Sequence, residues 1–270
     1  MQSTVAPSTL AVANFLSSIL QETYGAIARA IGAAIGIPAQ LSVGQSLEEF
    51  ASGQAHVGFL CGLLYVRMAE SPACPVEVVA APVLAGERYR QQPIYYSDVV
   101  VRQASPYHSF DDLAGCAWAY NERVSHSGCN LVCYSLLERG KTPYYFGSTL
   151  KTGSHLNSLQ AVIAGQADAA ALDSHVLDAL LRTDRSLASR IRTVAQLGPS
   201  SIPPVVVARS LDPLLKQQIQ AVLVTMHQDP AVAQALQAGC IERFVPVTDQ
   251  QYDDIRQMWR QVQAHTFPFV

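Results

Sequence analysis

The sequence predicts an α/β protein built as two lobes. Short β-rich runs alternate with segments of helical period, one ten-residue pattern occurs twice, and the length of 270 residues exceeds one average domain. With 49% hydrophobic and 14% charged residues, the composition excludes a disordered chain, a coiled coil and a protein with a charged tail. The chain is therefore globular, with enough length to bury a core.

The first elements predict a β–α unit followed by a second one. Residues 10–15 read as a strand, and the next helix carries an apolar stripe of Tyr24, Ile27, Ile31 and Ile35 that ends at Gly36. Ser46 and Glu49 form a capping box that opens another helix, which closes at Gly53, and residues 56–60 read as a buried strand.

The alternation continues toward the C-terminus. Further strands are predicted at Val76–Val83, Ser97–Arg102, Ala117–Tyr120, Ala169–Leu172, Ile191–Ala195 and Val205–Ala208. After Val205 the chain becomes mainly helical, because Asp212-Pro213 and Asp229-Pro230 each pair an N-cap with an N1 proline and Thr248 with Gln251 predicts a capping box. We expect these helices to pack on the first lobe.

A local repeat indicates that the two lobes are similar. Residues 51–60 and 163–172 share a helix end, the tripeptide Gly-Gln-Ala, one polar residue and a buried strand. We expect each copy in its own sheet, with the carboxyl ends of the two strands facing a common cleft.

Charge and targeting signals narrow the class of partner. Eighteen Lys and Arg against 21 Asp and Glu leave a net charge of -3, so nucleic acid is not an expected partner. No stretch reaches the roughly 18 apolar residues of a membrane span. Met1 to Thr9 lacks the basic and apolar regions of a secretory signal, so we expect a periplasmic protein whose signal was removed, or otherwise a cytoplasmic one. The six cysteines include no CxxC pair and do not decide the compartment.

A set of motifs carries a family resemblance that spans nearly the whole chain. The motifs, in order, are residues 53–62 leading to Tyr65-Val66, residues 95–101, 111–115, 125–128, 152–162 and 167–174, then Gly198-Pro199 and Ile202-Pro203-Pro204. Together they resemble the periplasmic phosphonate- and phosphate-type substrate-binding proteins of ABC transporters.

The resemblance implies an α/β, two-lobed type II periplasmic-binding-protein fold with a mixed sheet and flanking helices in each lobe and a central ligand cleft. The expected boundaries are residues 1–97 and 206–270 for lobe 1 and 98–205 for lobe 2, with crossovers near 96–101 and 202–207. It also implies a small oxyanion ligand (phosphate, phosphite or phosphonate), an ABC permease as partner, a monomer, and neither a cofactor nor catalysis.

The second lobe offers an anion site where a helix begins. Ser125-His126-Ser127-Gly128 precedes a helix with the period Leu131, Tyr134, Ser135 and Glu138, so the hydroxyls of Ser125 and Ser127 and the Gly128 amide are candidate donors to an oxyanion. An ordinary serine N-cap is the alternative interpretation. His155, in the first turn of a helix opened by Thr152-Gly153-Ser154, is a second candidate, with a structural histidine as its alternative.

Other candidates are aromatic or acidic. Tyr65, Tyr96 and Ser97 fall where strands or crossovers end, and each tyrosine is a core residue in the alternative reading. Asp173 and His175 follow the second Gly-Gln-Ala strand at the predicted cleft edge. In the phosphonate-binding relatives acidic residues near this point receive the ligand's amino group. Here His175 replaces one acid, which makes a phosphate-like, phosphite-like or simple alkylphosphonate anion at least as plausible as an aminoalkylphosphonate.

Other chemistries have weaker support. Cys129 and Cys133 share a helix face, but structural zinc needs four ligands. Ser127, His155 and Asp173 are triad residue types without a Gly-x-Ser-x-Gly elbow, and no nucleotide-binding loop is present. The alternative function is an enzyme on the same scaffold, of the thiamine-pyrimidine or menaquinone-precursor synthesis type, with His155 or His175 as acid–base, or a cytosolic sensor.

Overall fold

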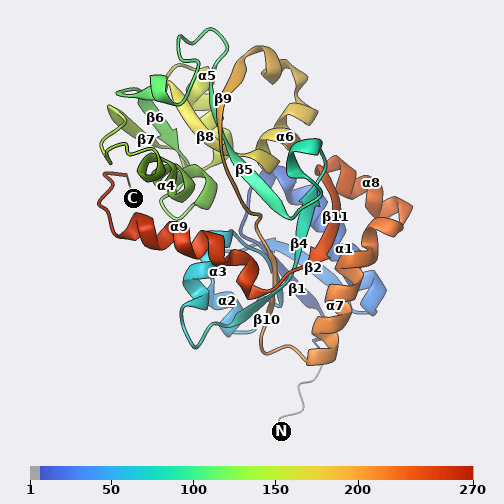
Figure 1. The fold of residues 1–270 in the computed structure, drawn as a ribbon. Coiled ribbons are helices and arrows are strands. Elements are labelled where there is room, and N and C mark those ends of the chain that lie inside the picture. Colours follow the sequence, from blue (N-terminus) through green and yellow to red (C-terminus); the bar gives the residue numbers. More distant parts are fainter. Residues whose placement is uncertain (1–6, 270) are drawn as a thin grey trace. The chain divides into compact units, whose positions relative to one another are not determined.

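The computed structural model describes residues 7–269, and the chain forms two compact units (Figure 1). The first unit comprises the chain up to Ile94 together with Ser201–Asp253, and the second comprises Tyr95–Ser200 and the chain from Asp254 onward. Residues 1–6, on which part of the signal-peptide prediction rests, lie outside the described residues. Within the described range, every helix is too short or too polar to cross a bilayer.

The first unit is built on a six-stranded mixed sheet. Its strands are β1 (Leu10–Asn14), β2 (Ala39–Val43), β3 (Val57–Phe59), β4 (Val76–Leu84), β10 (Val205–Ala208) and β11 (Ile241–Pro246), in the order β11-β4-β10-β3-β1-β2. β1 pairs in parallel with β2 and β3, and β10 pairs antiparallel with β3 and β4. The helices are α1 (Gln21–Ile35), α2 (Glu48–Ala51), α3 (Gly62–Ala69), α7 (Pro213–Thr225) and α8 (Pro230–Ala238). α1 contacts α7 and α8, which lie beside it in Figure 1.

Most of the helix ends of this unit follow the sequence signals. Gly36 ends α1 with a left-handed φ of 72°, which a residue without Cβ adopts at no steric cost. The carboxylate of Glu49 accepts from the Ser46 amide at 2.9 Å, which is one half of the predicted capping box, whereas Ser46 Oγ accepts from the Glu48 amide at 3.2 Å. The capping box predicted at Thr248 and Gln251 was wrong: Thr248 makes no side-chain cap bond, and the side-chain amide of Gln251 donates to Ser201 Oγ at 3.3 Å.

The second unit has a five-stranded mixed sheet. Its strands are β5 (Ile94–Arg102), β6 (Ala117–Tyr120), β7 (Ser148–Lys151), β8 (Ala169–Asp173) and β9 (Ile191–Ser201), in the order β7-β6-β8-β5-β9. β6 is parallel to β7 and β8, whereas β5 is antiparallel to β8. The helices are α4 (Leu131–Glu138), α5 (His155–Ile163), α6 (Ser174–Thr183) and α9 (Asp253–Gln263), which starts at the last residue of the first unit.

The predicted repeat is confirmed, because its two copies lie in different sheets. Gly53 precedes β3 and Gly165 precedes β8, and both glycines have left-handed φ values, 75° and 76°. In each unit, a glycine with the same left-handed backbone conformation therefore connects the end of a helix to a buried strand.

Three strands were not predicted from the sequence: β2, β7 and β11. β2 and β7 are the outermost strands of their sheets and β11 lies at the far edge of the first sheet. All four residues of β7 are exposed, so this strand shows none of the apolar alternation on which a strand prediction depends.

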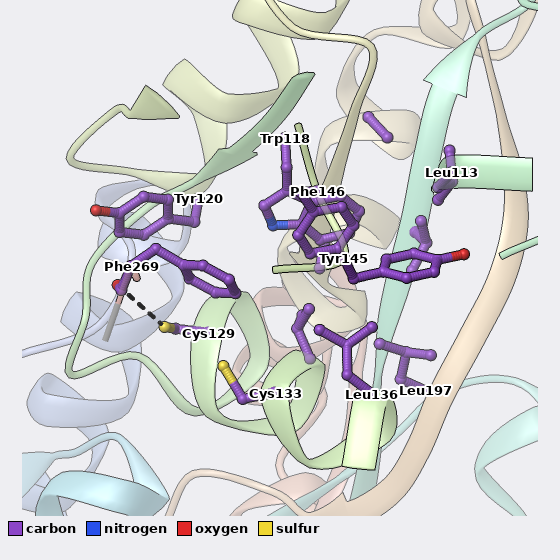
Figure 2. Close-up of a cluster of buried hydrophobic side chains, with 14 of the residues drawn as sticks. Leu113, Trp118, Tyr120, Cys129, Cys133, Leu136, Tyr145, Phe146, Leu197 and Phe269 are labelled. Atoms are coloured by element: carbon purple, nitrogen blue, oxygen red, sulfur yellow. Dashed lines mark hydrogen bonds between the residues drawn. The ribbon is translucent and has the colours of Figure 1, made fainter. Parts of the chain in front are cut away.

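The C-terminal end differs from the expected lobe boundary. Residues 206–270 were all expected in lobe 1, but the chain from Asp254 onward belongs to the second unit. Phe267 and Phe269 are buried in an aromatic cluster of that unit, where Phe269 packs against Tyr120 and Phe146 (Figure 2). Burial of these two rings outweighs the helical pattern that suggested packing on the first lobe.

Candidate functional site

The sheet order of the second unit brings polar residues to one edge. β6 and β8 are parallel, so Asn121, which follows β6, and Asp173, which ends β8, lie at the same edge of the sheet. β5 runs the opposite way, and its Ser97 pairs directly with Asp173. Residues from three neighbouring strands therefore meet where α5 and α6 begin.

The turn before α4 is tightly built. Ser125 Oγ accepts a hydrogen bond from the Gly128 amide at 3.1 Å, and His126–Asn130 form one turn of π-helix that leads into α4. Ser97 Oγ donates to the Ser127 carbonyl at 2.6 Å, which fixes the turn to β5. The Gly128 amide, expected as a ligand donor, is thus used as a helix-cap partner.

Glycine at position 128 is required by a close approach. A Cβ placed there would lie 1.9 Å from Asn121 Oδ1, which is far inside van der Waals contact. Because Gly128 has no side chain, Asn121 reaches across the turn to Ser125 and to α5.

Four side chains form what we call the Ser127 cluster: Asn121, Ser125, Ser127 and His155. Asn121 Nδ2 donates to Ser125 Oγ at 3.1 Å and lies 3.2 Å from His155 Nε2, and Ser127 Oγ lies 3.3 Å from the same nitrogen. Among the described residues, Asn121 Oδ1 is buried and has no hydrogen-bond partner; His155 Nδ1 is buried and makes no hydrogen bond of good geometry, although the Ala171 backbone acts to raise the pKa of His155. The cluster therefore has polar capacity that the protein itself does not use.

The Ser127 cluster carries no charge at neutral pH. Burial lowers the pKa of His155 to about 4, so its imidazole is neutral. In a neutral imidazole one ring nitrogen donates a hydrogen bond and the other accepts one. The Asn121 amide presents its oxygen or, after rotation by 180°, its NH2 group to the same position. The cluster can thus offer hydroxyl, amide and imidazole donors to an anion. None of the side-chain hydrogen bonds within the cluster involves a lysine or arginine.

His126 belongs to a different network. Its Nε2 lies 2.8 Å from Ser200 Oγ, its Nδ1 lies 3.2 Å from Asn130 Nδ2, and Ser200 Oγ donates to Asp254 Oδ2 at 3.1 Å. Both ring nitrogens of His126 therefore have protein partners. The predicted ligand residue His126 therefore bonds to Ser200 and Asn130, whereas His155 bonds within the Ser127 cluster.

Asp173, His175 and Tyr96 surround the start of α6. Asp173 Oδ1 accepts from the His175 amide at 2.8 Å and the Val176 amide at 3.4 Å, so the carboxyl caps the helix. Burial raises the pKa of Asp173 to about 7 despite these two hydrogen bonds, which act in the opposite direction. Tyr96 places its amide 3.0 Å from Ser174 Oγ. These residues form a second polar group beside Ser97.

Tyr65 is the one predicted site residue in the first unit. It lies on α3, is buried, donates its phenolic hydrogen to Asp249 Oδ1 at 2.5 Å, and meets Tyr252 edge to face. Since that hydrogen is engaged, the hydroxyl can offer a ligand only its lone pairs.

Sequence reasoning missed Asn121. Its signal was its position, since a polar side chain directly after the predicted strand Ala117–Tyr120 lies at the carboxyl edge of the sheet. The Asn121 amide connects two of the predicted site residues, Ser125 and His155.

The described residues do not form the geometry of a metal site or of a catalytic triad. Within residues 7–269, no group of three or more His, Cys, Asp or Glu side chains could hold a metal ion. Asp173 gives the Ser127–His155 pair no third member, because its carboxyl accepts from the His175 and Val176 amides at the start of α6. Cys129 and Cys133 are free and buried against the aromatic cluster shown in Figure 2.

Two mixed sheets with flanking helices, linked by repeated crossings of the chain, form the fold of the type II periplasmic binding proteins. Residues 10–252 match the model of the phosphonate periplasmic substrate-binding proteins of ABC transporters, and the chain belongs to this family.

Solved structures share the fold at low sequence identity. A binding protein component of an ABC phosphonate transporter from Pseudomonas aeruginosa is 17% identical, with a TM-score of 0.80 over 94% of this chain and 86% of that one. A protein from Prochlorococcus marinus, solved in complex with methylphosphonate, is 16% identical, with a TM-score of 0.81 over 96% of this chain and 100% of that one. The periplasmic aliphatic sulphonate binding protein of Escherichia coli is 16% identical, with a TM-score of 0.65 over 96% of this chain and 88% of that one.

Proposed function

We propose that this protein captures a phosphate-, phosphite- or phosphonate-like oxyanion at the Ser127 cluster and delivers it to an ABC permease. The observation that carries the proposal is the buried, uncharged cluster of hydroxyl, amide and imidazole groups, in which Asn121 Oδ1 has no hydrogen-bond partner. Membership of the family supplies the class of function, and the methylphosphonate bound by the Prochlorococcus relative supports the class of ligand.

The donors suit a tetrahedral anion. The hydroxyls of Ser125 and Ser127 and the imidazole of His155 approach one another from the turn and from α5, so several oxygens of one ligand can each receive a hydrogen bond. Neutral donors held rigidly favour an anion without the desolvation cost of a buried cationic partner.

The second polar group, formed by Tyr96, Asp173 and His175, is the candidate contact for the substituent of the ligand. Asp173 and His175 lie at the same sheet edge as Ser97, together with Tyr96, and we infer that they contact whatever extends from the phosphorus atom. With a pKa near 7, the carboxyl of Asp173 can donate to an oxygen or accept from a ligand hydroxyl. This property supports small anions as readily as an aminoalkylphosphonate.

Location and partners follow from the family. We infer that the mature chain acts in the periplasm as a monomer. Closure of the two units on the ligand is part of the same proposal, and small-angle scattering with and without ligand tests it through a fall in the radius of gyration.

A titration panel tests the proposal directly. Isothermal calorimetry and thermal unfolding would be run with phosphate, phosphite, methylphosphonate, aminoethylphosphonate and sulfate. At 100-fold excess of free ligand over its dissociation constant, the correct anion should stabilise the protein by about 2.7 kcal/mol. Lack of a response to all five anions would contradict the proposal and favour an enzyme on this scaffold.

Variants locate the site within the second unit. Ser127→Ala and His155→Ala should each weaken binding about 10-fold or more, since each removes a hydrogen bond to a charged ligand, and each should cost the unliganded protein about 1 kcal/mol per hydrogen bond lost within the cluster. Ser105→Ala is the matched control, because Ser105 is a buried serine of the same unit whose hydroxyl accepts from the Tyr107 amide. Equal affinity of all three variants would move the ligand away from the Ser127 cluster.

A further inference from the structure

His126 lies next to the Ser127 cluster in sequence but directs its ring to residues at the unit boundaries. The chain passes between the two units after Ile94, Ser200 and Asp253. The residues of the second unit at these three points are Tyr95, Ser200 and Asp254. All three are connected to the ring of His126.

The connections are direct or pass through one hydroxyl. The ring centroids of Tyr95 and His126 are 6.3 Å apart, and Ser200 Oγ lies 2.8 Å from His126 Nε2. Ser200 in turn donates to Asp254 Oδ2 at 3.1 Å. Within the second unit, His126 therefore contacts the chain at two of the crossings directly and reaches the third, at Asp254, through the Ser200 hydroxyl.

The hydrogen atoms of this relay can be assigned from its partners. Ser200 has one hydroxyl hydrogen, which goes to the carboxylate of Asp254, so Ser200 Oγ accepts from His126 Nε2–H. The Nδ1 atom of His126 then accepts from Asn130 Nδ2 at 3.2 Å. Every polar atom of the imidazole is thus satisfied in one neutral tautomer.

The burial of His126 supports a fixed orientation. The side chain is 0% exposed, and its burial lowers the pKa to about 3, so the ring stays neutral under all ordinary conditions. A neutral, fully bonded ring cannot rotate without breaking buried hydrogen bonds, which is costly. The backbone of the turn is also fixed next to His126, because Ser97 Oγ donates to the Ser127 carbonyl at 2.6 Å.

We infer that His126 is a positioning residue that couples the Ser127 turn to the three chain crossings through Tyr95, Ser200 and Asp254. The inference rests on the proposed function, because it assigns a role in oxyanion binding to a side chain that does not touch the ligand. Displacement of the turn on binding moves the crossings, and displacement of the crossings alters the turn's affinity.

Isosteric substitutions at Ser200 test the coupling. Ser200→Thr keeps the hydroxyl of the relay, whereas Ser200→Val has the same shape without it, so any crowding in this buried position is common to both. With methylphosphonate as the probe in calorimetry, we expect Ser200→Thr to bind within about 2-fold of the wild type. Ser200→Val should bind about 3- to 10-fold more weakly, which is the range of one or two neutral hydrogen bonds.

A double-mutant cycle separates coupling from a merely structural role. A structural role lowers the melting temperature of Ser200→Val but leaves the affinity of the folded protein unchanged. Coupling through the turn predicts that Ser200→Val has less than about 2-fold effect on affinity once Ser127→Ala is present, since the contact it positions is gone. If Ser200→Val does not fold, Asp254→Ala removes the relay's acceptor at a partly exposed position and carries the same prediction.

The outcomes are distinct. Equal affinities of Ser200→Val, Ser200→Thr and the wild type would overturn the inference, as would an undiminished effect of Ser200→Val in the Ser127→Ala background. Lack of methylphosphonate binding by the wild type, with phosphate and phosphite also silent, would refute the proposed function and this inference with it.

Discussion

Gly128→Ala is the sharpest test of how the site is packed. The added Cβ would lie 1.9 Å from Asn121 Oδ1 and 2.8 Å from its Cγ, so the Asn121 side chain has to leave its position. Its hydrogen bond to Ser125 at 3.1 Å and its contact with His155 at 3.2 Å are then lost.

The cost can be worked from these contacts. Overpacking costs about 1–3 kcal/mol and each lost hydrogen bond about 1 kcal/mol, while alanine gains about 1 kcal/mol over glycine in a helical turn. We therefore expect the second unit to lose about 2–4 kcal/mol of unfolding free energy.

Tryptophan fluorescence during urea unfolding measures this loss in the relevant unit. The chain has two tryptophans, Trp118 and Trp259, and both belong to the second unit. The double variant Asn121→Ala/Gly128→Ala removes the overlap, so it should be more stable than Gly128→Ala alone by about 1–3 kcal/mol. If Gly128→Ala unfolds like the wild type, or if Asn121→Ala destabilises it further, the interlocking of these two residues is refuted.

Three other predictions concern the second polar group, the first unit and the C-terminal end. The pKa of Asp173 is raised to about 7, so the folded state keeps a proton that the unfolded state has released, and stability should fall between about pH 4 and pH 7 by up to about 1.4 kcal/mol per pH unit. Asp173→Asn, which keeps a cap acceptor, should flatten this slope in unfolding curves at pH 4.5, 6 and 7.5, and an unchanged slope would assign it to other groups. Tyr65→Phe removes the hydrogen bond to Asp249 and should cost about 1–3 kcal/mol in thermal unfolding with little change in affinity; weaker anion binding at unchanged stability would instead place the hydroxyl on the ligand. Phe269→Ala opens the aromatic cluster around Tyr120 and Phe146 and should cost about 3 kcal/mol in urea unfolding followed by tryptophan fluorescence, whereas a loss below about 0.5 kcal/mol would mean that the C-terminal end adds no packing energy.

Local signals predicted the elements that position the site. The strand Ala117–Tyr120, the caps at Ser125 and Ser154 and the repeated Gly-Gln-Ala turns depend on periodicity and backbone chemistry, which are properties of neighbouring residues. Edge strands such as β7 were not predicted, because an exposed strand carries no apolar pattern.

The orientation of individual side chains could not be predicted in the same way. The Asn130 amide bonds to the Ser125 carbonyl at 3.1 Å, five residues back, and this wider turn rotates His126 and Ser127 away from the directions of an α-helix. Whether Gly128 offers its amide to a ligand or to Ser125, and which histidine meets Ser127, therefore depends on tertiary contacts with Asn121, Ser97 and Ser200.

The return of the chain to its second unit after Asp253 has a consequence for biosynthesis. Neither unit is contiguous, because the first needs Ser201–Asp253 and the second needs the aromatic residues near position 269. Those aromatic residues are synthesised after all the strands of the second unit, so this unit can complete its core only when they have emerged from the ribosome.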